Sequence, residues 1–317
     1  MPDQALPSSH SVCVIIPMYN GADSIEQTLA SVAGQTRLPD HVIVIDDGST
    51  DEGPQRVKDF VAPFRLTLLH QANEGQASAR NHGMQHSEET FVAFLDADDR
   101  FYPRKLEQQV ALFDELSRQG RPVALVDCYV HNDYSDGRRI LEDRQKNGRH
   151  FDDLIRANVV NGVSSVMVRR DVVKQLGGFN ASLRYSEDRF MWTRIAEHWE
   201  IHTVPEVLQQ RMVNSDNMTA QPTRYYPYKI RFIEAYLAQF GPQLSKQQRI
   251  DFALGSHSDF LELFSRRGEH AQVIGVYRRM LEYSWQTLIF RNGKPTLRFL
   301  YACVRSLRKA AASTTAH

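Results

Sequence analysis

Four consecutive residues, Asp96-Ala97-Asp98-Asp99, carry the strongest chemical signal in the sequence. They follow the apolar run Phe91–Leu95, and two carboxylates separated by one residue present their oxygens on the same side of a turn. Mg²⁺ and Mn²⁺ prefer oxygen ligands and commonly combine one or two carboxylates with the phosphates of a substrate. The stretch therefore predicts a site for a divalent cation. A solvated acidic turn that caps the next helix is the alternative interpretation.

Two further stretches hold polar groups next to glycine or other small residues. In Val44–Ser49, Asp47 can accept hydrogen bonds from a base or a sugar, and Gly48 allows a tight turn. In Asn73–Gly83, small residues at a helix start let the backbone approach a ligand, and Arg80 can reach a diphosphate or a base. A helix cap and an ordinary surface arginine are the alternatives for these two stretches.

Continuous apolar runs predict the strands that position these groups. The runs Val12–Ile16, Val42–Ile45 and Phe91–Leu95 are typical of parallel strands buried on both faces. Further strands are expected at 66–69, 123–126 and 163–168, and helices from Asp23 (with Glu26 in a capping box), at 55–61, from Gly75, from Pro103 and at 187–198. This order predicts an open, mostly parallel, Rossmann-like α/β sheet with flanking helices. Ligands of such sheets bind beyond the carboxyl ends of the strands, which is where the polar stretches lie.

The composition of the 317 residues is that of a folded globular protein, with 42% hydrophobic and 24% charged residues. The 38 basic and 38 acidic residues cancel, and the lack of a basic excess argues against a nucleic-acid binder. Three widely spaced cysteines, Cys13, Cys128 and Cys303, support neither a disulfide framework nor a zinc cluster. The first ten residues lack a signal-peptide pattern and no apolar run approaches the ~18 residues of a bilayer span. We therefore expect a cytoplasmic protein.

The C-terminal third has a different pattern. We expect a domain at 1–220 followed by a helical extension at 221–317. Formation of a homodimer through this extension is an open alternative. From Arg291 onward there are six basic residues and no acidic residue, so the rest of the chain has six more acidic than basic residues. The segment 296–309 has the spacing of a basic amphipathic helix. Such a helix suits peripheral contact with an anionic surface such as the inner face of the cytoplasmic membrane. A terminal helix packed on its own domain is the alternative.

Taken together and in this order, the motifs resemble family 2 of the inverting glycosyltransferases, whose nucleotide-sugar domain has the GT-A fold. The resemblance extends from Val12 to about Thr219. Each motif is weak by itself, whereas the ordered set is specific. The set consists of Val14–Asn20, Ser31–Thr36, Val44–Asp51, Asn73–Gly83, Asp96–Asp99, Leu176–Phe179 and Ser186–Asp188.

The resemblance implies a nucleotide-sugar donor and a divalent metal, Mn²⁺ or Mg²⁺. Asp96 would bind the ribose and Asp98 would ligate the metal on the diphosphate, with Asp99 supporting them. Many relatives also carry an Arg-x-His segment, but Val213 stands at the position of that histidine, which leaves Arg211, Asn214 or Asn217 as the further contact. The residues expected to bind the donor are Pro17, Tyr19, Asn20, Asp47, Arg80, Asn81, Asp96 and Arg211.

The resemblance also places the catalytic base in the acidic pair Glu187-Asp188, with Asp188 as the base and Glu187 beside it. Inverting transfer is a single displacement, in which a carboxylate takes the proton of the attacking hydroxyl. Because the reference pKa of Asp is only ~3.9, the proton transfer is expected to be late or the pKa raised by neighbours. The alternative is an acidic pair that only complements the helix dipole.

The expected activity is transfer of a sugar from a nucleoside-diphosphate sugar, by family habit a UDP-sugar, to a hydroxyl of a glycan or lipid-linked acceptor in cell-surface polysaccharide synthesis. A GT-A scaffold that binds nucleotide sugar without turnover is the alternative. A nucleotidyltransferase would carry a Gly-rich loop with a basic residue where Pro17–Asn20 stands, and a dehalogenase-type phosphatase would carry Thr or Val at Arg100. Trp192 and Trp199 could stack on an acceptor sugar, although tryptophans in helices are more often core residues.

Overall fold

The computed structural model describes residues 10–213 and 221–290, with only the backbone for 285–290. The chain divides into two compact units between Asn214 and Ser215. The predicted amphipathic segment 296–309 and the candidate contacts Asn214 and Asn217 lie outside the described residues.

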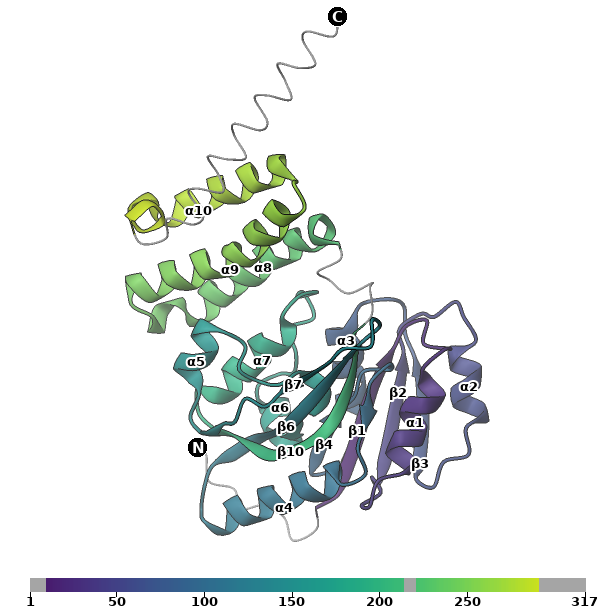
Figure 1. Ribbon diagram of the computed structural model, residues 1–317. Helices are drawn as coiled ribbons and strands as arrows, with labels where there is room; N and C mark the ends of the chain where they lie inside the picture. Colours follow the sequence, from purple (N-terminus) through teal and green to yellow (C-terminus); the bar gives the residue numbers. More distant parts are fainter. Residues whose placement is uncertain (1–9, 214–220, 291–317) are drawn as a thin grey trace, which may run out of the picture. The chain divides into compact units, whose positions relative to one another are not determined.

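The first unit is built on one mixed sheet with the strand order β3-β2-β1-β4-β9-β6-β10-β5, to which β7 and β8 add at β6 and β10 (Figure 1). The three strands predicted from apolar runs and the strand expected at 66–69 form its parallel half, β3-β2-β1-β4. β9 then runs antiparallel to both β4 and β6, while β6 and β10 are parallel. The predicted open α/β sheet is thereby confirmed. The strands are β1 Val12–Met18, β2 His41–Asp46, β3 Arg65–His70, β4 Phe91–Phe94, β5 Arg100–Phe101, β6 Val123–Tyr134, β7 Arg139–Glu142, β8 Asn147–Gly148, β9 Met167–Arg169 and β10 Glu200–Val213.

Helices cover both faces of this sheet, so the unit has three layers. Along β1, Val12, Val14 and Ile16 pack into one core with α1 and α4, whereas Cys13 and Ile15 pack into a second core with α3, α6 and α7. This alternation follows from the two-residue period of a strand, and burial on both faces explains why the runs are apolar throughout. The helices are α1 Ile25–Ala33, α2 Gly53–Asp59, α3 Gln76–His86, α4 Lys105–Arg118, α5 Phe151–Arg156, α6 Arg170–Gln175 and α7 Glu187–Ala196.

Three local expectations differ from the structure. The helix expected to be capped by Asp23 begins after Ser24, whose hydroxyl donates to the Gly21 carbonyl (3.4 Å). The strand expected at 163–168 starts as a 3₁₀ turn, Val163–Ser165, and only β9 joins the sheet. The long strand β10 escaped prediction because half of it is partly exposed and polar, which hides the apolar pattern.

The second unit is helical, as predicted for the C-terminal extension. It contains α8 Pro222–Phe240, a 3₁₀ turn at Gly241–Gln243, α9 Lys246–Arg266 and α10 His270–Phe290. Aromatic side chains form its interior; Tyr236 and Phe252 stack with ring centroids 4.3 Å apart. α9 begins with a capping box in which Ser245 and Gln248 bond reciprocally to each other's backbone. Among the described residues, no helix combines the length and low polarity that a membrane crossing needs.

Candidate functional site

The carboxyl ends of β1 and β2 are joined by hydrogen bonds. The Asn20 side-chain oxygen accepts from the backbone N–H of Thr50 (2.8 Å), and the Asn20 N–H donates to the Ser49 hydroxyl (2.9 Å). Asn20 has a left-handed backbone (φ 51°), which asparagine tolerates better than most residues. The turn leaves the Tyr19 ring 53% exposed at this edge, while Pro17 is buried in β1.

Asp46 and Asp47, at the end of β2, turn to different neighbours. Asp47 accepts from the backbone N–H groups of Glu74 and Gly75, both at 2.9 Å, and so holds the loop before α3. Asp46 accepts from the Ser49 N–H and contacts the His70 ring at 2.9 Å. Burial works to raise the pKa of Asp46, but these hydrogen bonds lower it below its usual value. Both carboxylates therefore fix the loops at this edge of the sheet, and donor binding by Asp47 stays a prediction.

The acidic turn after β4 is fixed from several sides. The Thr28 hydroxyl donates to the carbonyls of Ala97 (2.8 Å) and Asp99 (2.9 Å), and the Met212 N–H donates to the Asp99 carboxylate (3.1 Å). Burial raises the pKa of Asp98, and the charge of Asp96 adds to the rise. The pKa of Asp99 is raised well above its usual value by the same two causes and by Asp98.

The pKa values of Asp98 and Asp99 are raised because both carboxylates are buried close to other carboxylates. A divalent cation relieves this condition, and the donor set is made of oxygens, which Mg²⁺ and Mn²⁺ prefer. The positive charge of Arg211 favours the ionised form of Asp98. The residues present at this turn therefore fit a divalent metal.

Arg80 connects the acidic turn to the acidic pair on α7. Its guanidinium donates to Asp96 and to Glu187, both at 2.9 Å, and to Gln76 at 3.1 Å. The side chain is only 1% exposed, and the two carboxylates outweigh the effect of burial and raise its pKa. The structure shows Arg80 as a buried link between two carboxylates, and its predicted contact with the donor stays a prediction.

The acidic pair opens α7 directly after a strained residue. Ser186 has a left-handed backbone (φ 54°), which turns the chain into the helix. Glu187 is buried, and burial raises its pKa while Arg80 opposes the rise. Asp188 is partly exposed and accepts a hydrogen bond from the Asn158 side-chain amide (3.2 Å). Of the pair, Asp188 is thus the carboxylate open to a substrate.

Asn81 binds the backbone of Phe179 with both amide atoms, each at 2.8 Å. Gly178 has φ 79°, and a Cβ there would lie 2.5 Å from the Asn81 oxygen, which explains the paired glycines of this stretch. Asn81 was predicted to contact the donor. In the structure its amide holds the loop after α6, and contact with the donor stays a prediction.

Arg211 lies near the end of β10, two residues before Val213. Its guanidinium donates to the carbonyl of Asn161 (2.9 Å) and lies 3.6 Å from Glu142. Gly162 has φ 107°, a backbone conformation that residues with a side chain rarely adopt, and a Cβ there would also displace this guanidinium. The sequence offered no signal for Asn158 or Asn161, because both lie between elements and outside every motif.

Cys13, His41 and Glu89 form a separate cluster whose ligand atoms lie within 4.8 Å of one another. Sequence spacing could not reveal it, since these residues are far apart in the chain. Burial and Glu89 raise the pKa of the Cys13 thiol well above its usual value, and the positive charges of Arg170 and Arg65 act on it. A neutral thiol beside two arginines is a poor cation ligand, so the cluster is better explained as a thiol and an imidazole facing one carboxylate.

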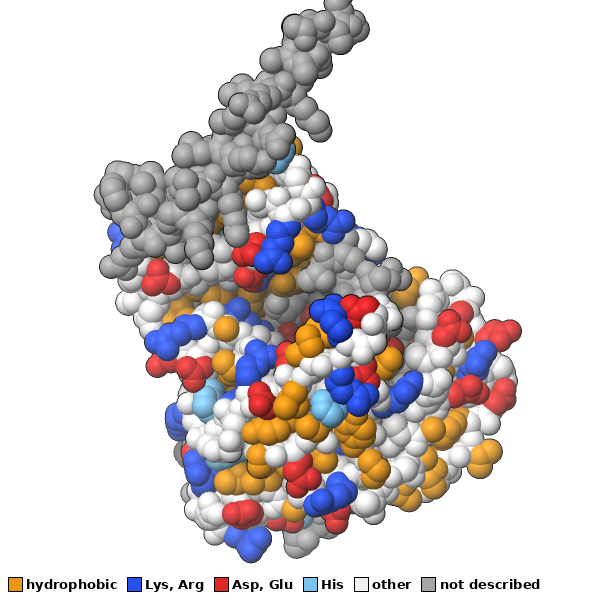
Figure 2. All heavy atoms as spheres, in the orientation of Figure 1, with side chains coloured by type: hydrophobic (Ala, Val, Ile, Leu, Met, Phe, Trp, Pro, Cys, Tyr) orange, Lys and Arg blue, Asp and Glu red, His pale blue; other side chains and the backbone are white. Residues whose placement is uncertain are grey.

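Trp192 and Trp199 are buried in the second core, at 0% and 4% exposure. They are core residues rather than a stacking surface for a sugar. On the outside, Figure 2 shows acidic and basic side chains side by side, with hydrophobic side chains between them. This mixture matches the balanced charge of the sequence.

The structure is that of an α/β protein with clustered carboxylates at the carboxyl edge of a mixed sheet. The model of glycosyl transferase family 2 matches residues 13–177. The chain belongs to this family.

Curated relatives are named as glycosyltransferases. An uncharacterized glycosyltransferase of Rickettsia bellii is 30% identical over 243 residues, which cover 73% of this chain but 34% of the relative. One from Rickettsia typhi is 25% identical, covering 81% of this chain and 80% of the relative. The chain thus spans only part of the length of some relatives.

Solved structures share the fold. The crystal structure of Staphylococcus aureus TarS residues 1–349 matches with a TM-score of 0.64 at 19% identity, covering 92% of this chain and 88% of that one. The complex of the same TarS fragment with UDP-GlcNAc matches with a TM-score of 0.57 at 18% identity, covering 86% and 89%. At these identities the likeness shows the fold alone.

Proposed function

We propose that this protein is an inverting, metal-dependent glycosyltransferase that uses a nucleoside-diphosphate sugar. One observation carries the proposal. Arg80 donates to both Asp96 and Glu187, so the acidic turn and the acidic pair of α7 lie next to each other. Family membership supports glycosyl transfer. TarS crystallises in complex with UDP and with UDP-GlcNAc, which favours a UDP-sugar donor here.

Asp98, with Asp96 beside it, would hold the divalent metal against the diphosphate. When bound, the metal neutralises charge that develops on the leaving diphosphate. The Asp99 carboxylate accepts a hydrogen bond from the Met212 N–H and so ties the acidic turn to β10. Arg211, held by the Asn161 carbonyl, supplies a second positive group for the phosphates.

Asp188 is the proposed base, since Glu187 is buried and paired with Arg80. Its carboxylate takes the proton from the acceptor hydroxyl as the oxygen forms a bond to the anomeric carbon. The bond from that carbon to the diphosphate breaks on the opposite face, so the configuration inverts. General-base assistance of this kind contributes typically 10²–10⁴-fold.

A donor panel tests the proposal. Release of nucleoside diphosphate is measured with Mn²⁺ for a set of UDP-, GDP- and other nucleotide sugars, in the presence of glycan and lipid-linked acceptors. We expect turnover with one base, abolished by chelation of the metal and by Asp98→Asn. Nucleotide binding without release for any donor and acceptor would instead indicate a scaffold.

The base is tested by Asp188→Asn. This variant is expected to keep nucleotide binding and to lose transfer by at least 10²-fold, while Asp59→Asn, an exposed change on α2, leaves transfer at the wild-type rate. Binding is measured by calorimetry and transfer by product formation. Near-normal turnover of Asp188→Asn would remove Asp188 from the role.

The acceptor is proposed to be a glycan or lipid-linked sugar of cell-surface polysaccharide synthesis, reached at the inner face of the cytoplasmic membrane. The basic amphipathic sequence at 296–309 supports this proposal. Deletion of 291–317 is expected to preserve soluble donor hydrolysis and to reduce sedimentation with anionic vesicles. Unchanged vesicle binding would refute the membrane role of the segment.

A further inference from the structure

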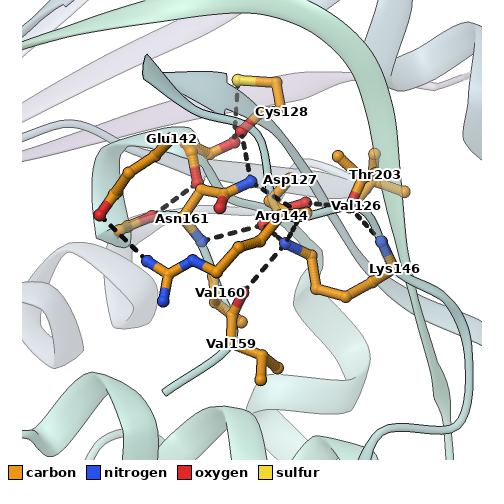
Figure 3. Close-up of polar contacts among 12 residues, drawn as sticks. Val126, Asp127, Cys128, Glu142, Arg144, Lys146, Val159, Val160, Asn161 and Thr203 are labelled. Atoms are coloured by element: carbon orange, nitrogen blue, oxygen red, sulfur yellow. Dashed lines mark hydrogen bonds and ion pairs between the residues drawn. The ribbon is translucent and has the colours of Figure 1, made fainter. Parts of the chain in front are cut away.

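A buried ion pair anchors the segment 143–162, which joins β7 to the turn before β9. Lys146 lies 2.8 Å from Asp127 on β6, and the two side chains are 2% and 0% exposed. Asp127 also accepts from the Thr203 hydroxyl (2.7 Å) and from the Asn161 N–H (3.1 Å). Figure 3 shows these contacts converging on Asp127 from both ends of the segment. The charges of Asp127 and Lys146 therefore neutralise each other, and the Asp127 carboxylate has hydrogen-bond donors as well.

The same cluster closes the segment on itself. Lys146, near its start, donates to the Val159 carbonyl near its end (3.1 Å). The Asn161 amide donates to the carbonyls of Cys128 and Arg144, both at 3.1 Å, as Figure 3 shows. The Arg144 guanidinium in turn donates to the Asn158 carbonyl (2.9 Å). Two strands and both ends of the segment thus restrain residues 158–161.

The restrained residues are those that reach the site. The Asn158 amide donates to the Asp188 carboxylate at 3.2 Å, and the Asn161 carbonyl accepts from Arg211 at 2.9 Å. One short stretch therefore contacts both the partly exposed carboxylate of α7 and the arginine beside the acidic turn. A carboxylate that keeps one hydrogen-bonded oxygen in place presents its other oxygen in a defined direction.

We propose that segment 143–162 is a positioning element of the site, in which Asn158 orients the Asp188 carboxylate toward the acceptor hydroxyl and the Asn161 carbonyl holds Arg211 toward the phosphates. The proposal rests on the proposed transferase function. Asn158 is a positioning residue, because it acts through Asp188. The buried pair Asp127–Lys146 explains how a long connection between strands is ordered well enough to do this.

Asn158→Ala tests the proposal with Asn147→Ala as its control, an exposed asparagine of the same segment. Asn158→Ala is expected to lower kcat about ten-fold, as the loss of one hydrogen bond to a charged group implies, with unchanged donor KM and nucleotide affinity. The Asn158 side-chain oxygen also accepts from the Val160 N–H (3.3 Å), so the thermal midpoint is expected to fall slightly. Asn147→Ala is expected to match the wild type. A loss of kcat that is accompanied by an equal loss of nucleotide affinity would instead indicate a general disturbance of the site and overturn the proposal.

A double variant shows whether Asn158 acts through Asp188. In the Asp188→Asn chain, adding Asn158→Ala is expected to cause no further loss of residual turnover, since the two groups work as one unit. A further ten-fold loss, or wild-type kcat for Asn158→Ala alone, would overturn the inference while leaving the transferase function intact. Absence of turnover by the wild type with every donor would overturn the proposed function, and this inference with it.

Discussion

Replacing Arg80 with Met would remove the one group that links the two acidic motifs. Arg80 is 1% exposed, and its partners differ in burial: the Glu187 side chain is 12% exposed and that of Asp96 is 26% exposed. Removing one partner of a buried ion pair costs about 3–5 kcal/mol, because the remaining charge is left in a poor environment. Asp96 can recover hydration, so Glu187 carries most of the cost. We expect a loss of about 3 kcal/mol, the lower end of that range.

The loss should depend on pH with a defined sign. Burial already raises the pKa of Glu187 and Arg80 opposes this rise, so removing Arg80 raises it further. Between the unfolded value of about 4.3 and the raised native value, the native state binds more protons than the unfolded chain. Stability in this range therefore falls as pH rises. The cost of Arg80→Met should be largest near neutral pH and smaller near pH 5.

Urea unfolding at both pH values measures the effect, with Arg56→Met as a matched control. Arg56 is 38% exposed and pairs with Glu26 at the surface, so its loss is expected to cost about 0–1 kcal/mol. Arg80→Lys keeps the charge without the two-pronged geometry and serves if the Met variant does not fold. Equal losses for Arg80→Met and Arg56→Met at both pH values would refute the assigned role of the buried link.

Two further predictions concern buried contacts. Lys146→Met leaves Asp127 buried without its cation and should lower the free energy of unfolding by about 3–5 kcal/mol, measured with urea. Adding Asp127→Asn should restore part of this stability. A double variant as unstable as the single one would contradict this. Gly178→Ala must adopt a left-handed backbone and displace Asn81, so it should cost more than Gly177→Ala, which has φ 77° but open space around it. The strain alone is worth about 1–2 kcal/mol, and equal thermal shifts of the two variants would show that Asn81 moves freely.

The parallel half of the sheet followed from the sequence, because strands buried on both faces leave continuous apolar runs. β1, β2 and β4, which are buried throughout, were visible in this way. β10 was not, since a strand exposed along part of its length mixes polar and apolar residues. The short strands β7 and β8 carry too few residues for a periodic signal to form.

The motif residues were predictable as a group, whereas their individual partners were not. Nothing local to Arg80 shows that it is buried between Asp96 and Glu187, because Glu187 is 107 residues away in the chain. The same holds for Asn81 and Phe179, which are 98 residues apart. Direct donor contact by this arginine and this asparagine stays a prediction, and the structure adds that both are bonded within the chain.

By itself, the sequence determined the class of fold, the family and the edge of the sheet where the chemistry lies. These depend on hydrophobic periodicity and on short motifs, which are local properties of the chain. Only the tertiary structure decided which carboxylate of each pair is compensated and which stays open, since burial and ion pairing depend on residues brought together from distant segments. Glu187 is closed by Arg80 and Asp188 faces Asn158, and this division follows from packing alone.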